Sequence, residues 1–236
     1  VPEPFVQLTE MLYSPSMTYK KVAELVRTNA PLESTLLEMV NRKSFQKQIG
    51  RSVSQKIRDP QVAVSMLSFN GAKAILPIIM FKYMVKFRTE HFPLMGHKLW
   101  KHMVTTGVTA HYLLQQREYK DPVEGMLIGM YMHLGKLALF HQFIYSFDEV
   151  KLKALEKFHA ERQKSHHDNL MQVGPDQAVL LNLYNEHAHS ITQKLFDLQG
   201  WQKPNTFKLV MQELSENKPI GDCHPVTVAV RQGEAF

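Results

Sequence analysis

The 236-residue sequence has only one cysteine, Cys223. A single cysteine excludes an internal disulfide and a cysteine-based zinc cluster, and it favours a reducing compartment, so we expect a cytoplasmic protein. Long apolar runs are also missing. The longest, Ala74 to Phe81, is far shorter than the roughly 20 residues that cross a bilayer. No basic-then-apolar leader opens the chain, and we therefore expect a soluble protein.

Strand-like alternation of apolar and polar residues is almost absent from the sequence. Apolar side chains instead recur at helical spacing, and 44% hydrophobic residues are enough to bury a core. Proline and capping residues predict that helices begin at Pro31, Asp59-Pro60 and Asp121-Pro122. The predicted fold class is all-α, a multi-helix fold.

A connection around residues 91–96 divides the predicted helices into two groups. We expect an N-terminal helical subdomain over residues 1–96 and a second helical subdomain over residues 97–218. The valines at 226, 228 and 230 alternate with smaller residues, which is typical of extended backbone. Residues 219–236 are therefore predicted to form an extended C-terminal tail.

Acidic residues are missing between Met39 and Arg58, although the net charge of the whole chain is only +6. The basic side chains of this stretch are Arg42, Lys43, Lys47, Arg51, Lys56 and Arg58. Such a stretch can concentrate an anionic partner, and we assign that role to Arg42, Lys43, Lys47 and Arg51. A plain solvated face is the alternative. Nucleic acid is not expected as the partner, because aromatic interleaving, zinc spacing and RNP-like runs are absent.

The segment Met126 to Leu137 carries the most informative motif. An apolar run is followed by Met132-His133 and then by Leu134-Gly135-Lys136. It resembles the signature helix of the HD hydrolase superfamily, in which adjacent His and Asp precede an aliphatic-Gly-Lys. A thioether is a poor ligand for hard divalent metals, and imidazole in place of carboxylate removes a negative charge. We therefore expect no metal site. The alternative is an ordinary core helix in which His133 is a buried histidine with a hydrogen-bond partner.

Further motifs follow the order of one family. They are Pro31-Leu32 to Asn41, Gly50-Arg51-Ser52-Val53-Ser54, Leu99-Trp100-Lys101-His102, Gly129 to Leu137, and His187 with Trp201-Gln202-Lys203-Pro204. Over residues 18–214 the chain resembles an HDOD protein, the HD-related output domain of bacterial signalling proteins. It departs from the family pattern where Arg42 and Ser68 replace an expected Ser and Gly.

The resemblance implies relatedness to metal-dependent phosphohydrolases, but also an incomplete ligand set and a regulatory role. It places His102, His133, Lys136 and His187 as pocket candidates, and a site of three imidazoles stays open. We expect no catalytic residue and no cofactor. The predicted function is a non-catalytic protein of bacterial signal transduction, a pseudoenzyme that binds a protein partner or a small anionic ligand. The alternative is a metal-dependent phosphohydrolase with an altered metal-ligand set.

The sequence His166-His167-Asp168 also spells a His-Asp pair. Its neighbours are polar on all sides, whereas a metal centre needs a shielded and oriented shell. We therefore interpret this segment as a solvated loop.

Overall fold

The computed structural model of the chain describes residues 3–50, 56–86, 89–198 and 205–235. Within these ranges the regular structure is entirely helical, which confirms the predicted all-α class. In chain order the helices are α1 Glu3–Tyr13, α2 Tyr19–Arg27, α3 Ala30–Val40, α4 Lys43–Gln48, α5 Pro60–Met66, α6 Ser68–Met84, α7 Met95–Gln116, α8 Pro122–Tyr131, α9 Leu134–Ala160, α10 Lys164–Met171, α11 Gln177–Leu198, α12 Asn205–Ser215, the 3-10 helix Ile220–Asp222, and α13 Pro225–Glu234.

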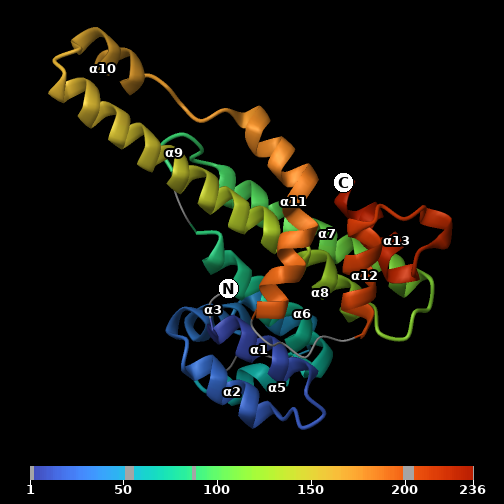
Figure 1. Cartoon of the computed structure of the whole chain (residues 1–236). Helices are drawn as coiled ribbons and strands as arrows, with labels where there is room; N and C mark the ends of the chain where they lie inside the picture. Colours follow the sequence, from blue (N-terminus) through green and yellow to red (C-terminus); the bar gives the residue numbers. More distant parts are fainter. Residues whose placement is uncertain (1–2, 51–55, 87–88, 199–204, 236) are drawn as a thin grey trace.

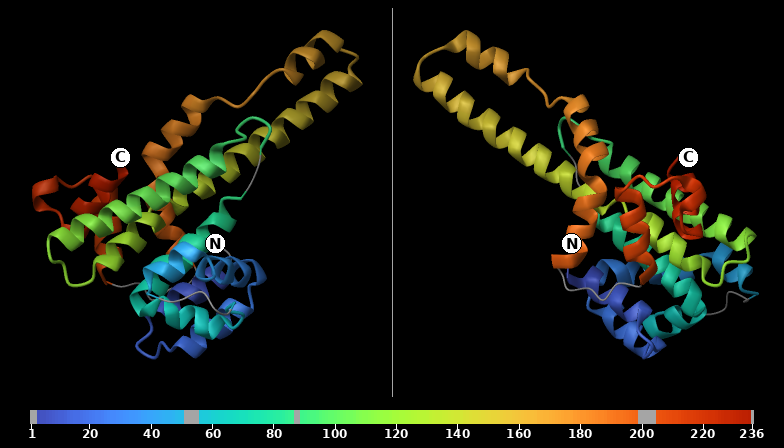
Figure 2. Two further views of the ribbon diagram at one scale, coloured as in Figure 1. Left: turned by 180° about the vertical axis from the view of Figure 1, so that it is seen from behind. Right: turned by 45° about the vertical axis from the view of Figure 1, so that its right-hand side comes forward.

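Figure 1 shows a helical body, which includes the long helix α7, and a pair of long helices that projects from it. The projecting arm consists of α9 and α11, with α10 at its tip, and Figure 2 shows it from two further sides. No residue of α10 is buried. Most of the segment 151–173 is exposed, and most of it is helical.

One large apolar core connects the two halves of the chain. It contains residues of the first half, such as Leu36 and Phe81, together with Met103, Tyr131 and Val230 of the second half. A second, smaller cluster at the base of the arm is built on Phe140, Ile144 and Leu180. The two predicted subdomains therefore share one core.

Two predicted helix starts are confirmed in detail. The Asp59 side chain accepts a hydrogen bond from the Gln61 amide at 2.9 Å, and Pro60 occupies the first turn of α5. Pro31 likewise lies in the first turn of α3, which is capped by Asn29. Proline suits this position because its missing N–H would have no helical partner there.

The third helix start is correct in position only. Helix α8 begins at Pro122, but the Asp121 side chain makes no capping hydrogen bond. Glu124 accepts a hydrogen bond from the Tyr119 hydroxyl at 3.3 Å. The segment expected to form one signature helix is also divided, because α8 ends at Tyr131 and α9 begins after His133.

The prediction of an extended C-terminal tail is wrong. Residues Pro225–Glu234 form α13, which packs against α7 and α8. The alternation of valines suggested a strand, but this segment also has the spacing of a helix. Val226, Ala229, Val230 and Gly233 lie at i, i+3, i+4 and i+7, and all four are buried on one face of α13. Alternating valines in a run of only five residues cannot distinguish the two-residue period of a strand from the 3.6-residue period of a helix.

Close packing fixes α13 against α7. A Cβ on Gly233 would lie 2.5 Å from the carbonyl oxygen of Thr106 in α7, so that only glycine allows this approach. At the other end, the His224 side chain accepts a hydrogen bond from the Val226 amide at 3.3 Å and caps the helix. The C-terminal helix is thus an integral part of the second half.

Among the described residues, no single helix has both the length and the apolar composition to cross a membrane. Helices α5 and α6 meet these criteria only as a pair, and the pair is bent by 112°.

Candidate functional site

A cluster of polar side chains lies where α7, the start of α9 and the end of α13 meet. It contains His102 of α7, His133 at the junction of α8 and α9, and Glu234 at the end of α13. One nitrogen or oxygen atom from each side chain lies within 4.8 Å of the others. The imidazole centroids of His102 and His133 are 4.5 Å apart. His133 is fully buried, whereas His102 and Glu234 are half-buried.

The turn that carries His133 is held by Thr192 of α11. The Thr192 hydroxyl oxygen accepts a hydrogen bond from the Gly135 amide at 2.8 Å and lies 2.9 Å from the Met132 carbonyl. A Cβ on Gly135 would lie 1.9 Å from the carbonyl oxygen of Ala188. Glycine is therefore required here because α9 and α11 approach so closely.

Among the described residues, the His133 side chain has one hydrogen-bond partner. Its Nε2 lies 3.1 Å from the hydroxyl oxygen of Thr106, while its Nδ1 is buried without a hydrogen-bond partner in the described part of the chain. An unpaired buried nitrogen is unfavourable by roughly 1–3 kcal/mol.

Lys136 reaches into the same cluster from the first turn of α9. Its Nζ donates a hydrogen bond to Glu234 Oε1 at 2.6 Å. The side chains are only 17% and 27% exposed, respectively, so this ion pair is partly shielded from water. The structure thus brings together three of the four pocket candidates, namely His102, His133 and Lys136.

The fourth candidate, His187, lies elsewhere. It is exposed on α11, where its Nε2 is 3.5 Å from a carboxylate oxygen of Glu186. The histidine of α11 that approaches the cluster is His189, which sequence reasoning missed. His189 precedes the buried Thr192 and Phe196 by three and seven residues, a helical spacing that could have identified it.

Burial keeps the histidines of the cluster neutral. Burial lowers the pKa of His133 well below its ordinary value, and the charge of Lys136 lowers it further. Burial also lowers the pKa of His102 and of His189, an effect that Lys136 reinforces and Glu234 opposes at both residues. At neutral pH the imidazoles therefore carry lone pairs and no charge.

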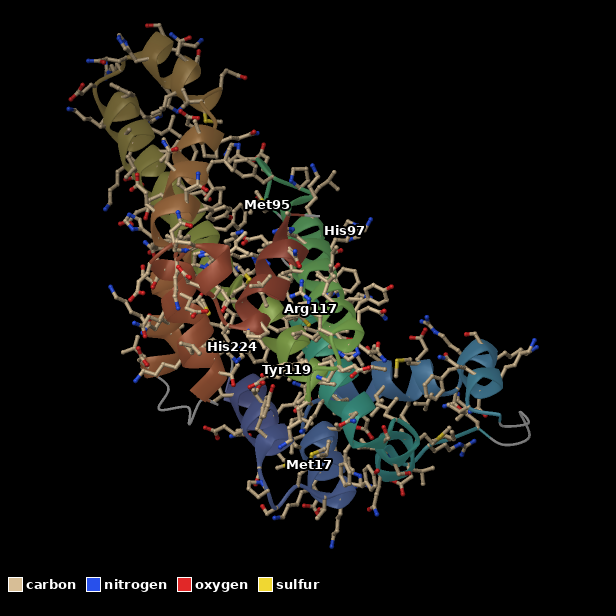
Figure 3. The ribbon with its side chains drawn as sticks, turned by 90° about the vertical axis from the view of Figure 1, so that its right-hand side faces the viewer. Met17, Met95, His97, Arg117, Tyr119 and His224 are labelled. Carbon is tan, nitrogen blue, oxygen red and sulfur yellow. The ribbon has the colours of Figure 1, made fainter. Side chains whose placement is uncertain are left out.

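Glu213 of α12 ties the C-terminal helix to the body. Its carboxylate accepts hydrogen bonds from the Thr227 hydroxyl at 2.5 Å, the His224 amide at 2.9 Å and Lys218 Nζ at 2.8 Å. Figure 3 shows His224 beside Tyr119, whose ring meets the imidazole edge-on. Burial would raise the pKa of Glu213, but these hydrogen bonds lower it to about 2. No sequence signal predicted this network, because the tail was expected to be extended.

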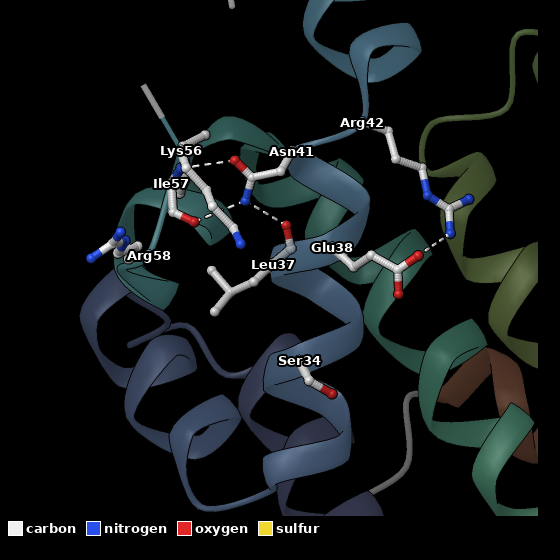
Figure 4. Close-up of a pocket in the computed structure, with 8 residues that line it drawn as sticks. All are labelled: Ser34, Leu37, Glu38, Asn41, Arg42, Lys56, Ile57 and Arg58. Atoms are coloured by element: carbon white, nitrogen blue, oxygen red, sulfur yellow. Dashed lines mark hydrogen bonds and ion pairs between the residues drawn. The ribbon is translucent and has the colours of Figure 1, made fainter. Parts of the chain in front are cut away.

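The basic stretch borders a cavity of about 670 Å³ beside α3. Figure 4 shows its lining, which includes Arg42, Lys56 and Arg58. The Asn41 side chain holds the two walls together through hydrogen bonds of 2.8 Å to both the amide and the carbonyl of Ile57. Arg42 is paired with Glu38 at 2.7 Å.

The other residues of the basic stretch are placed as follows. Lys43 and Lys47 are exposed on α4. Arg51 lies outside the described residues. His166-His167-Asp168, rejected above as a site, lies on α10 at the tip of the arm. It is helical rather than the loop we predicted, and His167 Nδ1 lies 3.3 Å from Oδ1 of its neighbour Asp168.

Comparison with known proteins identifies the family. The sequence model of the HDOD domain matches residues 1–174. The chain belongs to the HDOD family. A crystal structure of an HDOD domain protein with unknown function from Geobacter sulfurreducens superimposes with a TM-score of 0.62 at 15% identity, over 100% of this chain and 71% of that one. A candidate phosphohydrolase from Shewanella amazonensis SB2B gives a TM-score of 0.57 at 15% identity, over 100% and 75% of the two chains. No curated protein matches.

The family match covers only part of the cluster. His102 and His133 lie within the matched residues, whereas His189 and Glu234 lie beyond them. Among the residues that the structure describes, the carboxylate grouped with the two histidines is supplied by the last turn of α13. That carboxylate is already paired with Lys136, so the set does not fit a divalent cation as it stands.

Proposed function

We propose that this HDOD protein is a non-catalytic module of bacterial signal transduction, which binds a protein partner or a small anionic ligand. The observation that carries the proposal is the position of Lys136. Its ammonium group lies 2.6 Å from Oε1 of Glu234, the residue whose carboxylate is grouped with His102 and His133. A hydrolase of this superfamily needs a cation at that place to activate water.

Charge decides between the ammonium group and a metal ion. With neutral imidazoles, the charges of Lys136 and Glu234 cancel, and the cluster has no negative charge left to attract a dication. A dication about 4 Å from the ammonium nitrogen would be repelled by about 8 kcal/mol at an effective dielectric constant of about 20. Among the described residues, the cluster offers a dication a single carboxylate, with which Lys136 is already paired, whereas hard dications usually take several oxygen ligands.

The basic stretch supports an anionic partner. Glu38 is the one acidic residue lining the cavity beside α3, and it is already paired with Arg42. Lys56 and Arg58 are exposed and form no ion pair within the described residues. Uncompensated cations beside a concave surface raise the local concentration of anions.

Metal content and hydrolysis test the proposal. We expect the purified protein to contain no stoichiometric metal and to hydrolyse neither bis(p-nitrophenyl) phosphate nor p-nitrophenyl phosphate above background. Lys136→Met serves as the matched variant, because it frees the Glu234 carboxylate without changing either histidine. We expect this variant to bind Mn²⁺ or Zn²⁺ more tightly than the wild type in calorimetric titrations.

The alternative, a metal-dependent phosphohydrolase with an altered ligand set, is favoured by the grouping of His102, His133 and Glu234. It requires the Lys136–Glu234 pair to open. About one equivalent of iron, manganese or zinc in the wild type, lost in His102→Ala together with a metal-dependent hydrolase activity, would establish this alternative and exclude the non-catalytic role.

Partner binding needs a separate test. Reversing the charge of Lys47 and Arg51 together should leave folding intact, because Lys47 is exposed and makes no ion pair in the described part of the chain. The double variant should lose affinity for whatever anionic protein or ligand co-purifies with the wild type at low salt. Reversing the charge of Lys157 and Lys164 together, both exposed on the arm, changes the net charge by the same amount and is the control for a general loss of positive charge. If the double variant bound the partner with the affinity of the wild type, the basic stretch would be only a solvated face.

A further inference from the structure

A second cavity, of about 300 Å³, lies at the base of the arm between the start of α7 and the first half of α11. Its walls include Phe92, Met95, Leu180, Leu181 and Tyr184. Figure 3 marks Met95 at the beginning of α7. The volume is at the lower end of the range of small-molecule sites, and a mostly apolar lining is typical of such sites.

The floor of this cavity belongs to the small apolar cluster rather than to the main core. Leu180 packs there with Phe140 and Ile144, and the rings of Phe92 and Phe140 meet edge-on with centroids 5.8 Å apart. At the rim, Leu94 is 61% exposed and Leu181 is 59% exposed. An apolar ligand would cover side chains that the chain itself leaves in water.

Two polar groups give the cavity a preferred ligand charge. Lys98 lines it and forms no ion pair within the described residues, and no Asp or Glu is among the residues that line it. The Tyr184 hydroxyl is buried and has no hydrogen-bond partner there. Burial raises the pKa of Tyr184, so the hydroxyl stays protonated and keeps its proton to donate.

From the cavity, its apolar walls and the unpaired Lys98, we propose that this site binds a small apolar carboxylic acid. The hydrocarbon part lies against Phe92, Met95 and Tyr184, and the carboxylate pairs with Lys98. A neutral ligand leaves the ammonium group unpaired, and a cationic ligand is repelled by it. Binding at this site requires neither a metal ion nor the basic stretch.

Three probes of one chain length test the proposal on the full-length protein: octanoate, 1-octanol and octylammonium. In calorimetric titrations below the micelle concentration, octanoate should bind with a Kd about two- to fivefold lower than that of octanol, as one exposed ion pair predicts. Octylammonium should bind most weakly. Octanoate and octanol binding equally to the wild type would overturn the proposal.

A pair of lysine variants locates the effect. Lys98→Gln should bring the octanoate Kd up to the octanol value and leave the octanol Kd unchanged. Lys101→Gln removes an exposed charge from the same helix outside the cavity, and it should keep the wild-type preference. If Lys98→Gln keeps the preference, or Lys101→Gln loses it, the carboxylate is not held by Lys98.

The methyl resonance of Met95 gives a second, independent readout. In protein with ¹³C-labelled methionine methyl groups, octanoate should shift the Met95 signal, which Met95→Leu assigns by its disappearance. The signal of Met17, which follows α1 in the N-terminal half, should not move. Octanoate binding without a Met95 shift would place the ligand elsewhere and overturn the proposal.

Discussion

Lys136 Nζ lies 2.6 Å from Glu234 Oε1, although the two residues are 98 positions apart in the chain. The contact joins the first turn of α9 to the last residue of α13. It therefore links α9 to α13 beside His133. It also places an ammonium group and a carboxylate together in the histidine cluster.

Breaking this ion pair should be measurably destabilising. Lys136→Met leaves the Glu234 carboxylate partly buried without its partner, and we expect a loss of about 1–3 kcal/mol in the free energy of unfolding from urea titrations. Lys153→Met breaks the Lys153–Glu149 pair, whose side chains are 70% and 46% exposed, and should cost less than about 0.5 kcal/mol. Equal losses of unfolding free energy in the two variants would show that the partly buried pair stabilises the fold no more than the exposed pair does.

Gly135 should tolerate no side chain. In Gly135→Ala the new Cβ would meet the Ala188 carbonyl at 1.9 Å, so α9 and α11 must separate, and we expect a loss of about 3 kcal/mol or more. Gly221→Ala is the control, since a Cβ there meets nothing within 4 Å. Thermal and urea unfolding of both variants measures the difference. A mild effect at Gly135 would mean that the two helices are farther apart.

Trp100 should contribute less than its size suggests. Its helical spacing with Leu99 and Met103 predicts a buried indole, but the side chain is half-buried, and its Nε1 donates to the Ile78 carbonyl at 3.4 Å. We expect Trp100→Ala to cost about 2–3 kcal/mol, below the range for a full core position. Tyr112→Ala, 58% exposed on the same helix, should cost much less. A loss below about 1 kcal/mol at Trp100 would show that the indole contacts contribute little.

Local signals account for most of the successful fold prediction. Pro31 and Asp59-Pro60 mark helix starts through short-range chemistry, which needs no knowledge of the rest of the chain. The failure at residues 225–234 has an equally local cause, because Val226 and Val230 satisfy the spacing of a strand and of a helix. Tertiary packing of α13 on α7 and α8, which includes the close approach of Gly233 to Thr106, decides between them.

The candidate site was predictable only in part, for a different reason. His102 and His133 were found through the family motifs in which they stand, and both are in the cluster. Glu234 has no motif, and it joins the cluster solely because α13 packs on α7. Residues that long-range packing brings together are far apart in the chain, so no local pattern in the sequence identifies them as members of one site.

Glu213 should make the stability of the protein depend on pH in the acidic range. Burial would raise the pKa of its carboxyl group, but hydrogen bonds from Lys218, Thr227 and the His224 amide lower it to about 2. An unfolded glutamate titrates near about 4.3. Because the folded pKa is the lower one, the stabilisation is complete above about pH 4.3 and is lost as the pH falls toward 2.

The comparison of Glu213→Gln with the wild type isolates this effect from other titrating groups. Glutamine keeps the shape of the side chain but cannot carry the charge that Lys218 and Thr227 stabilise. In urea titrations, the free energy of unfolding of the wild type should exceed that of Glu213→Gln most at pH 6. This difference should be smaller at pH 4 and smaller again at pH 3. Glu216→Gln, on an exposed residue that follows α12, should track the wild type at each pH. A difference between wild type and Glu213→Gln that stays constant from pH 6 to pH 3 would mean that the hydrogen bonds at Glu213, rather than its ionisation, hold α13 in place.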